Sequence, residues 1–488
     1  MKKTIITLFV SFSVLFSLTS CNDWLDVTPQ AQVSADKIFS TPEGYESVLY
    51  GIYISMTEGK VYGQHSTYGL MDVLAQYYNV YTNKAHTLYE ASLYNYYNGD
   101  VRNVIDDIWL NNYNTIANCN ILLEYLAKKD PNYFKTNHYN LLKGEALAIR
   151  AFLHFDLLRA FALNYQNNPE AMGIPYANSF TQNIHHQLKI KDVTEKIIND
   201  LQEARGLLKD IDPVFKDNFK EMIYHFTQPQ PENDEFISYR AYRMNYYAVT
   251  ALLARVYDYY GDKDNAYKYA KEVITAVDNG LFQFTPESSF TAALQDRDLV
   301  TQNELLFALN STDVKLLFYQ ADANNNSAYI LLEKESIYTD PDDFRQYLIG
   351  ESTSHGKDIS YKYLKLTNED GYVGKIPMLR ISEMYFIAAL SIFNTNKKEA
   401  VGYLETIRKM RGASQVINSE SYDQFLQEIM LEAKREFLGE GQLFYWYKRH
   451  NLPVKRQGSD ITLSPQQMCL PMPANEVEFG NRIEDYIK

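Results

Sequence analysis

Acidic side chains are the most numerous groups in this chain that could do chemistry, yet their spacing marks no catalytic pair. The 488 residues include 61 Asp and Glu against 47 Lys and Arg. Hydrolysis of a glycosidic bond needs two carboxylates at a fixed separation, one of them with a raised pKa. The adjacent Asp342 and Asp343 are most simply explained by a loop, and Glu428 with Glu432 by a solvated helix face.

Motifs that position other reactive groups are also missing. The sequence has no glycine-rich phosphate loop, no Gly-x-Ser-x-Gly elbow and no His-Glu-x-x-His pair. His185 and His186 are adjacent, and adjacent histidines rarely bind one metal, so we expect them in a loop. Cys119 and Cys469 could form one disulfide, but their spacing does not demand it, and we expect buried thiols. We predict no enzyme activity, no metal site and no cofactor.

Tyrosine is the residue type that points to binding. The chain has 41 Tyr but only 3 Trp, and nine of the tyrosines fall within residues 58–100, where helical periodicity breaks down. A tyrosine side chain suits sugar or peptide recognition at a surface and packing between helices equally well, so both interpretations stay open. The candidate ligand-binding residues are the densest cluster of this loop and two tyrosines further on: Tyr77, Tyr78, Tyr81, Asn83, Tyr319 and Tyr338.

The net charge disfavours one class of partner. The formal charge is -14. A protein that binds a nucleic-acid backbone needs clustered Lys and Arg, so we expect no nucleic-acid partner.

The first twenty residues are typical of a secretory signal peptide. Lys2 and Lys3 precede an apolar run over residues 5–18, which is too short for a comfortable membrane span. The end of this segment, residues 18–21 (Leu-Thr-Ser-Cys), resembles a bacterial lipobox, so Cys21 is the expected lipid attachment site. Acyl chains on Cys21 would anchor the protein to a membrane surface. Residues 21–40 are expected to form a tether.

Residues 141–165 predict the central helix of the fold, because they are apolar nearly all the way round a helix. Such a helix must be surrounded, and other helices are expected at residues 41–57, 101–128 and 193–208. Charged residues on a buried helix, here Arg150 and Asp156, are more often structural pairs than catalytic groups.

Helix pairs of the tetratricopeptide kind recur along the chain. One pair is expected at residues 239–260 and 265–276, and a second around residues 388–407. The residues that carry this spacing are Ala254, Tyr257, Gly261 and Ala266 in the first pair, and Ala388, Ser391, Thr395 and Ala400 in the second. We predict a mainly α fold of about four helix pairs. It would comprise an N-terminal region (41–280) and a C-terminal region (281–488) with an irregular insert (281–375). Short strands are expected at 305–309 and 361–366.

Several short motifs, read together, resemble the SusD/RagB family of outer-membrane nutrient-binding lipoproteins. They occur in the family's order and span almost the whole chain. The motifs are Cys21-Asn22-Asp23-Trp24-Leu25-Asp26, Arg150-Ala151-Phe152 with Phe155-Asp156-Leu157, Gly173-Ile174-Pro175, Asp343-Phe344-Arg345, Pro377-Met378-Leu379-Arg380-Ile381-Ser382-Glu383-Met384-Tyr385, Arg435-Glu436, Glu440-Gly441 and Leu470-Pro471-Met472-Pro473-Ala474-Asn475-Glu476.

Four positions depart from the family pattern. Leu390, Ala433, Leu443 and Trp446 stand where the family usually or often has charged residues. We interpret these changes as apolar packing in place of a structural ion pair, which is close to neutral for stability.

The resemblance implies a lipid-anchored protein on the outer face of an outer membrane. Such a protein sits as a lid on a TonB-dependent porin of the SusC type and captures glycan, or peptide in RagB-like members, without catalysis. The helix pairs would pack on the porin and the irregular loops would meet the ligand. A third hypothesis, from a different class, is a tetratricopeptide scaffold with protein partners only, and the long inserts argue against it.

Overall fold

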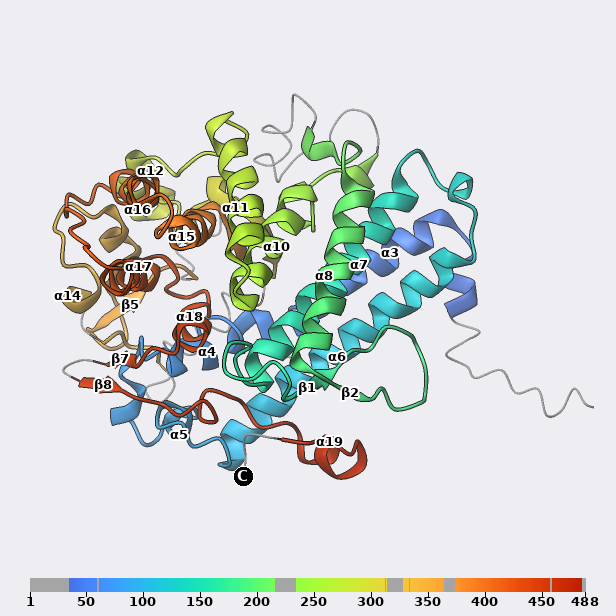
Figure 1. Cartoon of the computed structure of the whole chain (residues 1–488), viewed down its shortest axis with the longest axis horizontal. Helices are drawn as coiled ribbons and strands as arrows, with labels where there is room; N and C mark the ends of the chain where they lie inside the picture. The colour runs from blue at the N-terminus through green and yellow to red at the C-terminus, as the bar shows by residue number, and fades with distance from the viewer. Residues whose placement is uncertain are drawn as a thin grey trace, which may run out of the picture. The chain divides into compact units, whose positions relative to one another are not determined.

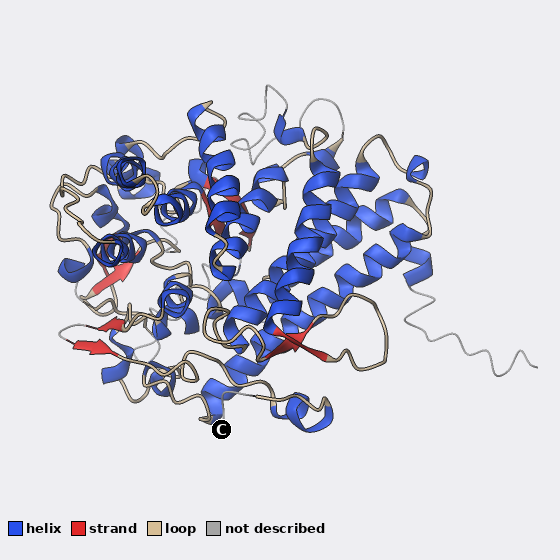
Figure 2. Cartoon of the chain, in the orientation of Figure 1, coloured by secondary structure: helices blue, strands red, loops and turns tan. Residues whose placement is uncertain are grey.

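The computed structural model describes residues 35–58, 61–215, 234–311, 313, 328–332, 334–363, 374–456 and 459–484. The signal peptide, Cys21 and Tyr319 lie outside these residues. The chain divides into residues 1–45 and residues 46–488, and the account below concerns the second unit. Within the described ranges, helices dominate and the strands are short (Figure 2). None of the helices in these ranges is both long and apolar enough to cross a membrane.

A series of helices forms the framework, and each helix packs on the next (Figure 1). In chain order they are α6 (Gly99–Ala127), α7 (His138–Phe161), α8 (Ile190–Leu208), α10 (Tyr246–Tyr260), α11 (Lys263–Asp278), α15 (Ile381–Ile392) and α16 (Lys397–Met410). Two further helices, α17 (Tyr422–Glu436) and α18 (Leu443–His450), follow, and α17 packs on α15. Helix α3 (Pro42–Ser55) precedes the series. The predicted mainly α class is confirmed.

Local sequence explains why the expected helix pairs form. Gly261 ends α10 in the left-handed conformation (φ 89°), and the Asp262 carboxylate then accepts a hydrogen bond from the Asn265 amide, 3.0 Å away, to begin α11. In the second pair, the Asn396 side chain accepts from the Glu399 amide at 3.3 Å and begins α16 without a preceding glycine. Both pairs predicted from small-residue spacing are therefore present.

Helix α7 is the buried centre that its composition predicted. Every residue from 144 to 161 is buried. Its charged residues have partners: the Arg150 guanidinium donates to both carboxylate oxygens of Asp200, at 2.7 and 2.8 Å, and Asp156 pairs with Arg159. The structural interpretation of Arg150 and Asp156 is confirmed, although the two do not pair with each other.

The strands form small two-stranded antiparallel sheets. The pairs are β1 (Met172–Pro175) with β2 (Gln187–Lys189), β3 (Leu305–Asn310) with β6 (Lys375–Arg380), β4 (Ile349–Glu351) with β5 (Asp358–Ser360), and β7 (Val454–Arg456) with β8 (Ser459–Ile461). Strand β3 confirms the prediction for 305–309. The strand prediction for 361–366 is wrong for residues 361–363, because β5 ends at Ser360 and a turn follows; residues 364–366 lie outside the described ranges.

Residues 58–100, expected to be irregular, contain short helical turns in their described part. They are the π-helix η4 (Val61–His65), α4 (Leu70–Leu74), the 3-10 helix η5 (Asn79–Thr82) and α5 (Tyr89–Ser92). The insert holds similar pieces, among them α12 (Glu287–Thr291), α14 (Lys334–Ile337) and the 3-10 helix η12 (Phe344–Leu348), and α19 (Ala474–Phe479) lies near the C-terminus. These turns fix the path of the chain between the long helices.

The four departures from the family pattern are buried. Leu390, Ala433, Leu443 and Trp446 all lie in the core. This burial confirms that apolar packing occupies these positions.

Candidate ligand-binding face

The tyrosine-rich segment and the insert are joined by backbone hydrogen bonds, although some 250 residues separate them. Tyr78 and Leu331 form an isolated antiparallel bridge. The Asn79 amide donates to the Ile330 carbonyl (2.8 Å), and the Leu332 amide donates to the Tyr77 carbonyl (2.9 Å). The two parts of the chain that lack helix-pair periodicity therefore lie side by side.

A cluster of aromatic rings fills the junction. The ring of Tyr329, from the insert, lies 5.2 Å from Tyr68, 5.2 Å from Tyr78 and 5.5 Å from His86, measured between centroids. The Gln64 side-chain amide donates to the Tyr329 hydroxyl at 3.3 Å. All of these rings are buried. In this part of the tyrosine-rich segment, the rings pack against one another in the interior.

Three of the candidate ligand-binding residues are buried, which argues against the prediction that they contact a ligand. Tyr77 and Tyr78 are 0% and 1% exposed, and Tyr338 is also buried. Their hydroxyls point inward: Tyr77 donates to the Lys434 carbonyl (2.7 Å) and Tyr338 to the Arg435 carbonyl (3.0 Å). A ring covered on both faces cannot stack on a ligand in this conformation, so we do not retain these three as contacts.

Tyr81 and Asn83 remain accessible and define what we call the Tyr81 face. Both are half-buried. The Arg456 guanidinium, from β7, lies 4.4 Å from the centroid of the Tyr81 ring. Arg456 is held in place because it donates to the Gln76 side-chain oxygen (2.9 Å) and the Ser92 carbonyl (3.0 Å). A cation over one face of a tyrosine ring fixes that ring and leaves its exposed part for a ligand.

Sequence reasoning missed Arg456. It lies far along the chain from Tyr81, on a short strand that no periodicity marks, so the sequence offered no signal for it. Next to Tyr81 along the chain, the side chains of Thr82 and Lys84 are exposed. Hydroxyl, amide and ammonium groups therefore accompany the Tyr81 ring on this segment.

A buried carboxylate ties the same segment to the C-terminal region. Asp72, in α4, accepts hydrogen bonds from the amides of Gly439 (2.7 Å) and Gly441 (3.0 Å). Burial raises the pKa of Asp72 to about 8 in spite of these two donors. A raised pKa suits a general acid, but Asp72 is fully buried and held by backbone amides, so its contacts are structural.

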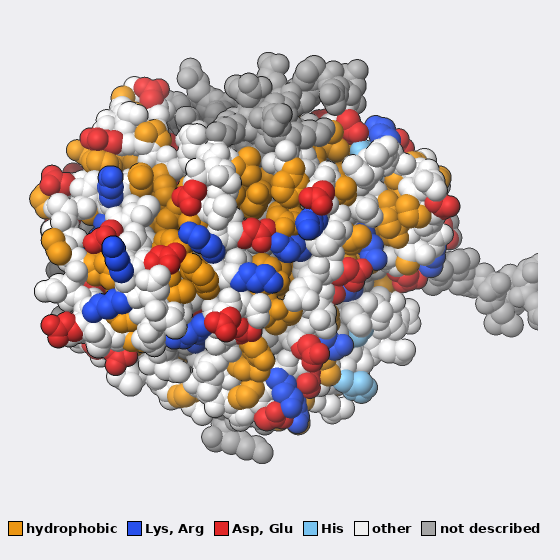
Figure 3. All heavy atoms as spheres, turned by 45° about the horizontal axis from the view of Figure 1, so that its top comes forward, with side chains coloured by type: hydrophobic (Ala, Val, Ile, Leu, Met, Phe, Trp, Pro, Cys, Tyr) orange, Lys and Arg blue, Asp and Glu red, His pale blue; other side chains and the backbone are white. Residues whose placement is uncertain are grey.

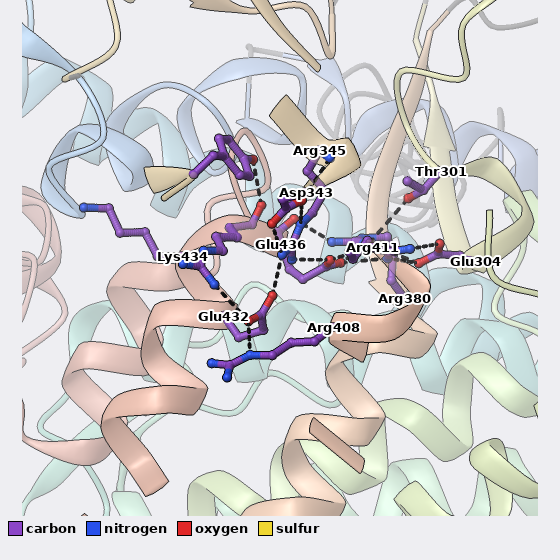
Figure 4. Close-up of polar contacts among 12 residues, drawn as sticks. Thr301, Glu304, Asp343, Arg345, Arg380, Arg408, Arg411, Glu432, Lys434 and Glu436 are labelled. Carbon is purple, nitrogen blue, oxygen red and sulfur yellow. Dashed lines mark hydrogen bonds and ion pairs between the residues drawn. The ribbon is translucent and has the colours of Figure 1, made fainter. Parts of the chain in front are cut away.

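The family motifs converge on a largely buried group of charged side chains, which we call the ion cluster and of which Figure 4 shows the central part. Its ion pairs connect six basic residues with six acidic residues. These are Arg345, Lys362, Arg380, Arg408, Arg411 and Arg435 with Glu304, Asp343, Glu428, Glu432, Glu436 and Glu440. The formal charges cancel.

One sequence interpretation is wrong at this cluster. Asp343 lies in a loop as expected, where it is buried and pairs with Arg345 at 2.6 Å. Glu432, expected on a solvated helix face, is fully buried between arginines. The amphipathic pattern of α17 did not reveal this, because a charged residue on the inner face of a helix looks the same in sequence as one on the outer face.

Glu436 is the centre of the ion cluster. It accepts from Arg345 (2.8 Å), Arg380 (2.9 Å) and Arg411 (2.7 and 3.0 Å). Burial alone would raise the pKa of Glu436, but the three guanidinium groups outweigh burial and hold this pKa well below its usual range. Such a carboxylate stays ionised and does not donate a proton. The cavity beside it has a volume of only about 10 Å³, so no ligand fits there.

Cysteine and histidine side chains, which bind metals in many proteins, are not grouped into a metal site in the described part of this chain. Cys119 and Cys469 are buried free thiols, as expected, and burial raises the pKa of Cys119 to about 12. His185 lies in a loop, where a ring nitrogen is 3.2 Å from the Ser179 carbonyl. In the described part of the chain, no group of three or more His, Cys, Asp and Glu is arranged to hold a metal ion.

Figure 3 shows one face of the molecule, on which Lys and Arg side chains alternate with Asp and Glu. The described residues on this face form no basic patch of the kind that binds a nucleic-acid backbone.

The fold and the Tyr81 face define a class of protein: a helix-pair array that carries an irregular, tyrosine-lined face. Two family models match the chain. Residues 23–228 match a SusD-like model described as "Starch-binding associating with outer membrane", and residues 333–468 match the SusD family model. Together the two models cover well over half of the chain. The chain belongs to the SusD/RagB family.

Solved structures show the same fold. A SusD superfamily protein from Bacteroides thetaiotaomicron VPI-5482 is 24% identical, with a TM-score of 0.71 over 90% of this chain and 98% of that one. A SusD-like carbohydrate binding protein from Bacteroides vulgatus ATCC 8482 is 16% identical, with a TM-score of 0.70 over 91% and 98%. Surface glycan-binding protein A from B. thetaiotaomicron, in complex with laminarihexaose, is 15% identical, with a TM-score of 0.64 over 90% and 98%. No significant match was found among curated proteins.

Proposed function

We propose that this chain is a non-catalytic surface lipoprotein that captures an oligo- or polysaccharide and delivers it to a TonB-dependent porin of the SusC type. The observation that carries the proposal is the match of residues 23–228 to a family model described as starch-binding and associated with the outer membrane. A structural neighbour that holds laminarihexaose lends support at the level of the fold.

The ligand would meet the Tyr81 face. The ring of Tyr81, braced by Arg456, would stack on the apolar face of a sugar ring, and the Asn83 amide would bond to its hydroxyls. Tyr319, which lies outside the described residues, stays a predicted contact. The ion cluster argues against catalysis at the family motifs, because its carboxylates are paired with cations and all of them except Glu428 are buried.

Anchoring would use Cys21, which carries the lipid in this proposal and holds the protein on the outer face of the outer membrane. Replacement of Cys21 with Ser is expected to abolish incorporation of labelled palmitate and to release the protein from the membrane fraction. Continued labelling of the variant would contradict this part of the proposal. Co-purification of a large β-barrel protein with the wild-type chain tests the porin partner.

Peptide capture is the second candidate, and one observation favours it. Flat polysaccharide sites often use Trp, but Trp109 and Trp446 are both buried here. An extended peptide could instead bond to the amide and hydroxyl groups beside Tyr81.

The test compares Tyr81→Ala with a matched control, Tyr133→Ala, which removes a partly exposed tyrosine outside the Tyr81 face. Because an aromatic contact contributes about 0.5–1.5 kcal/mol beyond area burial, Tyr81→Ala should weaken glycan binding by about two- to tenfold or more. Tyr133→Ala should bind like the wild type. Equal affinities for all three proteins would refute the assignment of the Tyr81 face.

A further inference from the structure

A separate open cavity shares none of its described lining residues with the Tyr81 face or the ion cluster. Its volume is about 570 Å³, within the range of about 300–1,000 Å³ typical of small-molecule sites. It lies between α3, the segment that leads into α10, and the end of β3. Its lining residues are Tyr50, Tyr53, Ile54, Glu235, Ser238, Tyr239, Tyr242, Arg243, Leu309 and Asn310. We call it the four-tyrosine cavity.

Two of its tyrosines are held in fixed positions. The Tyr53 hydroxyl donates to a carboxylate oxygen of Glu145 (2.6 Å) and accepts from the Met244 amide (2.8 Å), so only its ring faces the cavity. The Tyr50 ring has the Arg243 guanidinium carbon 5.1 Å from its centroid and is 37% exposed. Because the Arg243 guanidinium already restricts the Tyr50 ring, this ring loses little conformational entropy when a ligand stacks on it.

The charge distribution selects against anionic ligands. Arg243 offers no free charge, because its Nε and Nη2 donate to Glu145 (2.6 and 3.0 Å) and its Nη1 donates to the Phe236 carbonyl (3.1 Å). Among the described lining residues, the exposed carboxylate is that of Glu235. A negatively charged ligand would therefore meet a like charge there, and none of these described residues offers an uncompensated cation.

Backbone strain marks the same place. Tyr239 has φ 57° and ψ 37°, the left-handed region that costs a bulky residue about 1–3 kcal/mol. Such strain persists where the surrounding structure holds it, and it gathers at ligand sites. At this position, where the positive φ favours glycine, the chain has Tyr239, and this residue lines the cavity.

We propose that the four-tyrosine cavity binds a neutral pyranose unit, as a second carbohydrate site distinct from the Tyr81 face. The tyrosine rings suit the apolar face of a sugar, and the exposed side chains of Glu235 and Asn310 suit its hydroxyls. The choice of carbohydrate over other uncharged ligands rests on the proposed function.

The test uses the purified full chain and saturation-transfer NMR with methyl glycosides of neutral hexoses, pentoses and N-acetylhexosamines, beside methyl glycosides of uronic acids and a set of short peptides. Tyr50→Ala removes the accessible ring. Ile54→Arg, at a 58% exposed position on the rim, blocks the entrance without disturbing the core. Leu110→Arg, at a 51% exposed position on α6, is the matched control, and Tyr81→Ala isolates the other face.

The proposal expects saturation transfer from the wild type to at least one neutral glycoside. Measured in the Tyr81→Ala background, which removes the proposed contact at the other face, the transfer should fall at least fivefold when Tyr50→Ala or Ile54→Arg is added, and stay unchanged when Leu110→Arg is added. Transfer to no neutral glycoside, equal transfer to uronides, transfer to peptides alone, or transfer that both cavity variants keep would overturn it.

Failure of this inference can be told from failure of the proposed function. If polysaccharide binding depends on Tyr81 while no methyl glycoside enters the cavity, the second site is refuted and glycan capture stands. If no saccharide of any length binds the wild type, both are refuted.

Discussion

Replacement of Glu436 with Gln should destabilise the fold strongly, because it unbalances the ion cluster. Glu436 contacts three guanidinium groups at 2.7–3.0 Å, and six cations there face six anions. Gln has nearly the same shape but no charge, so the variant leaves one buried positive charge without compensation. Breaking one partner of a buried ion pair costs about 3–5 kcal/mol, and we expect a loss of that size in the free energy of unfolding.

The measurement is urea unfolding at pH 7, followed by circular dichroism. The matched control is Glu405→Gln, an exposed position on α16 where a change within about 0.5 kcal/mol is expected. A second variant, Arg380→Gln combined with Glu436→Gln, removes one charge of each sign and should recover part of the loss. A loss below about 1 kcal/mol for Glu436→Gln would refute the claim that the ion cluster supports the fold.

Three further predictions concern other residues. Burial lowers the pKa of His154 to about 3, and its Nε2 accepts from the Ala177 amide (3.0 Å), so the folded chain holds it neutral. Between pH 6.5 and 3 only the unfolded chain takes up this proton, so the stability that the neutral His154 contributes is lost as the pH falls. Lowering the pH from 7 to 5 should reduce the free energy of unfolding of the wild type by about 2 kcal/mol more than that of His154→Gln. Parallel pH profiles of the two proteins in urea unfolding would contradict this prediction. Gly441→Ala should lower the free energy of unfolding in urea by more than about 1 kcal/mol, because Gly441 has φ 67° and a Cβ there would lie 2.1 Å from the Ser66 carbonyl oxygen. The control is Gly402→Ala on α16, where nothing obstructs a Cβ, and it should be neutral or stabilising. Equal behaviour of the two variants would argue against the close approach at Gly441. Calorimetric titration with glycan should separate Tyr81→Ala from Tyr133→Ala as described above.

The long helices were predictable because their evidence is local. The apolar composition of residues 141–165 alone requires burial on all sides, and α7 is buried in that way. The spacing of Ala254, Tyr257 and Gly261 predicts a helix, a turn and a close neighbour, and α10 and α11 follow it. Such signals extend over one or two turns of chain, so no distant contact is needed to interpret them.

The candidate site was harder to predict because its evidence is not local. Tyr77 and Tyr81 lie four residues apart in one tyrosine-rich run, yet the first is buried by contacts to α17 and the second is braced by Arg456. The same composition therefore serves packing and recognition, as the two open interpretations allowed. The ion cluster escaped notice for a related reason, because the sequence of α17 does not show which of its carboxylates face inward.

The four-tyrosine cavity illustrates the same limit. Its walls come from three segments separated by about 70 to 190 residues, and no local pattern links these segments to one another. Only the fold brings Tyr50, Arg243 and Asn310 together.

Calorimetric titration of the chain with a panel of polysaccharides, and separately with a pool of peptides, tests the central claim most directly. Our account predicts heat with one class of glycan, weaker binding of that glycan in Tyr81→Ala by about two- to tenfold or more, and no heat with peptides. Heat with peptides alone, or silence with every ligand, would contradict glycan capture.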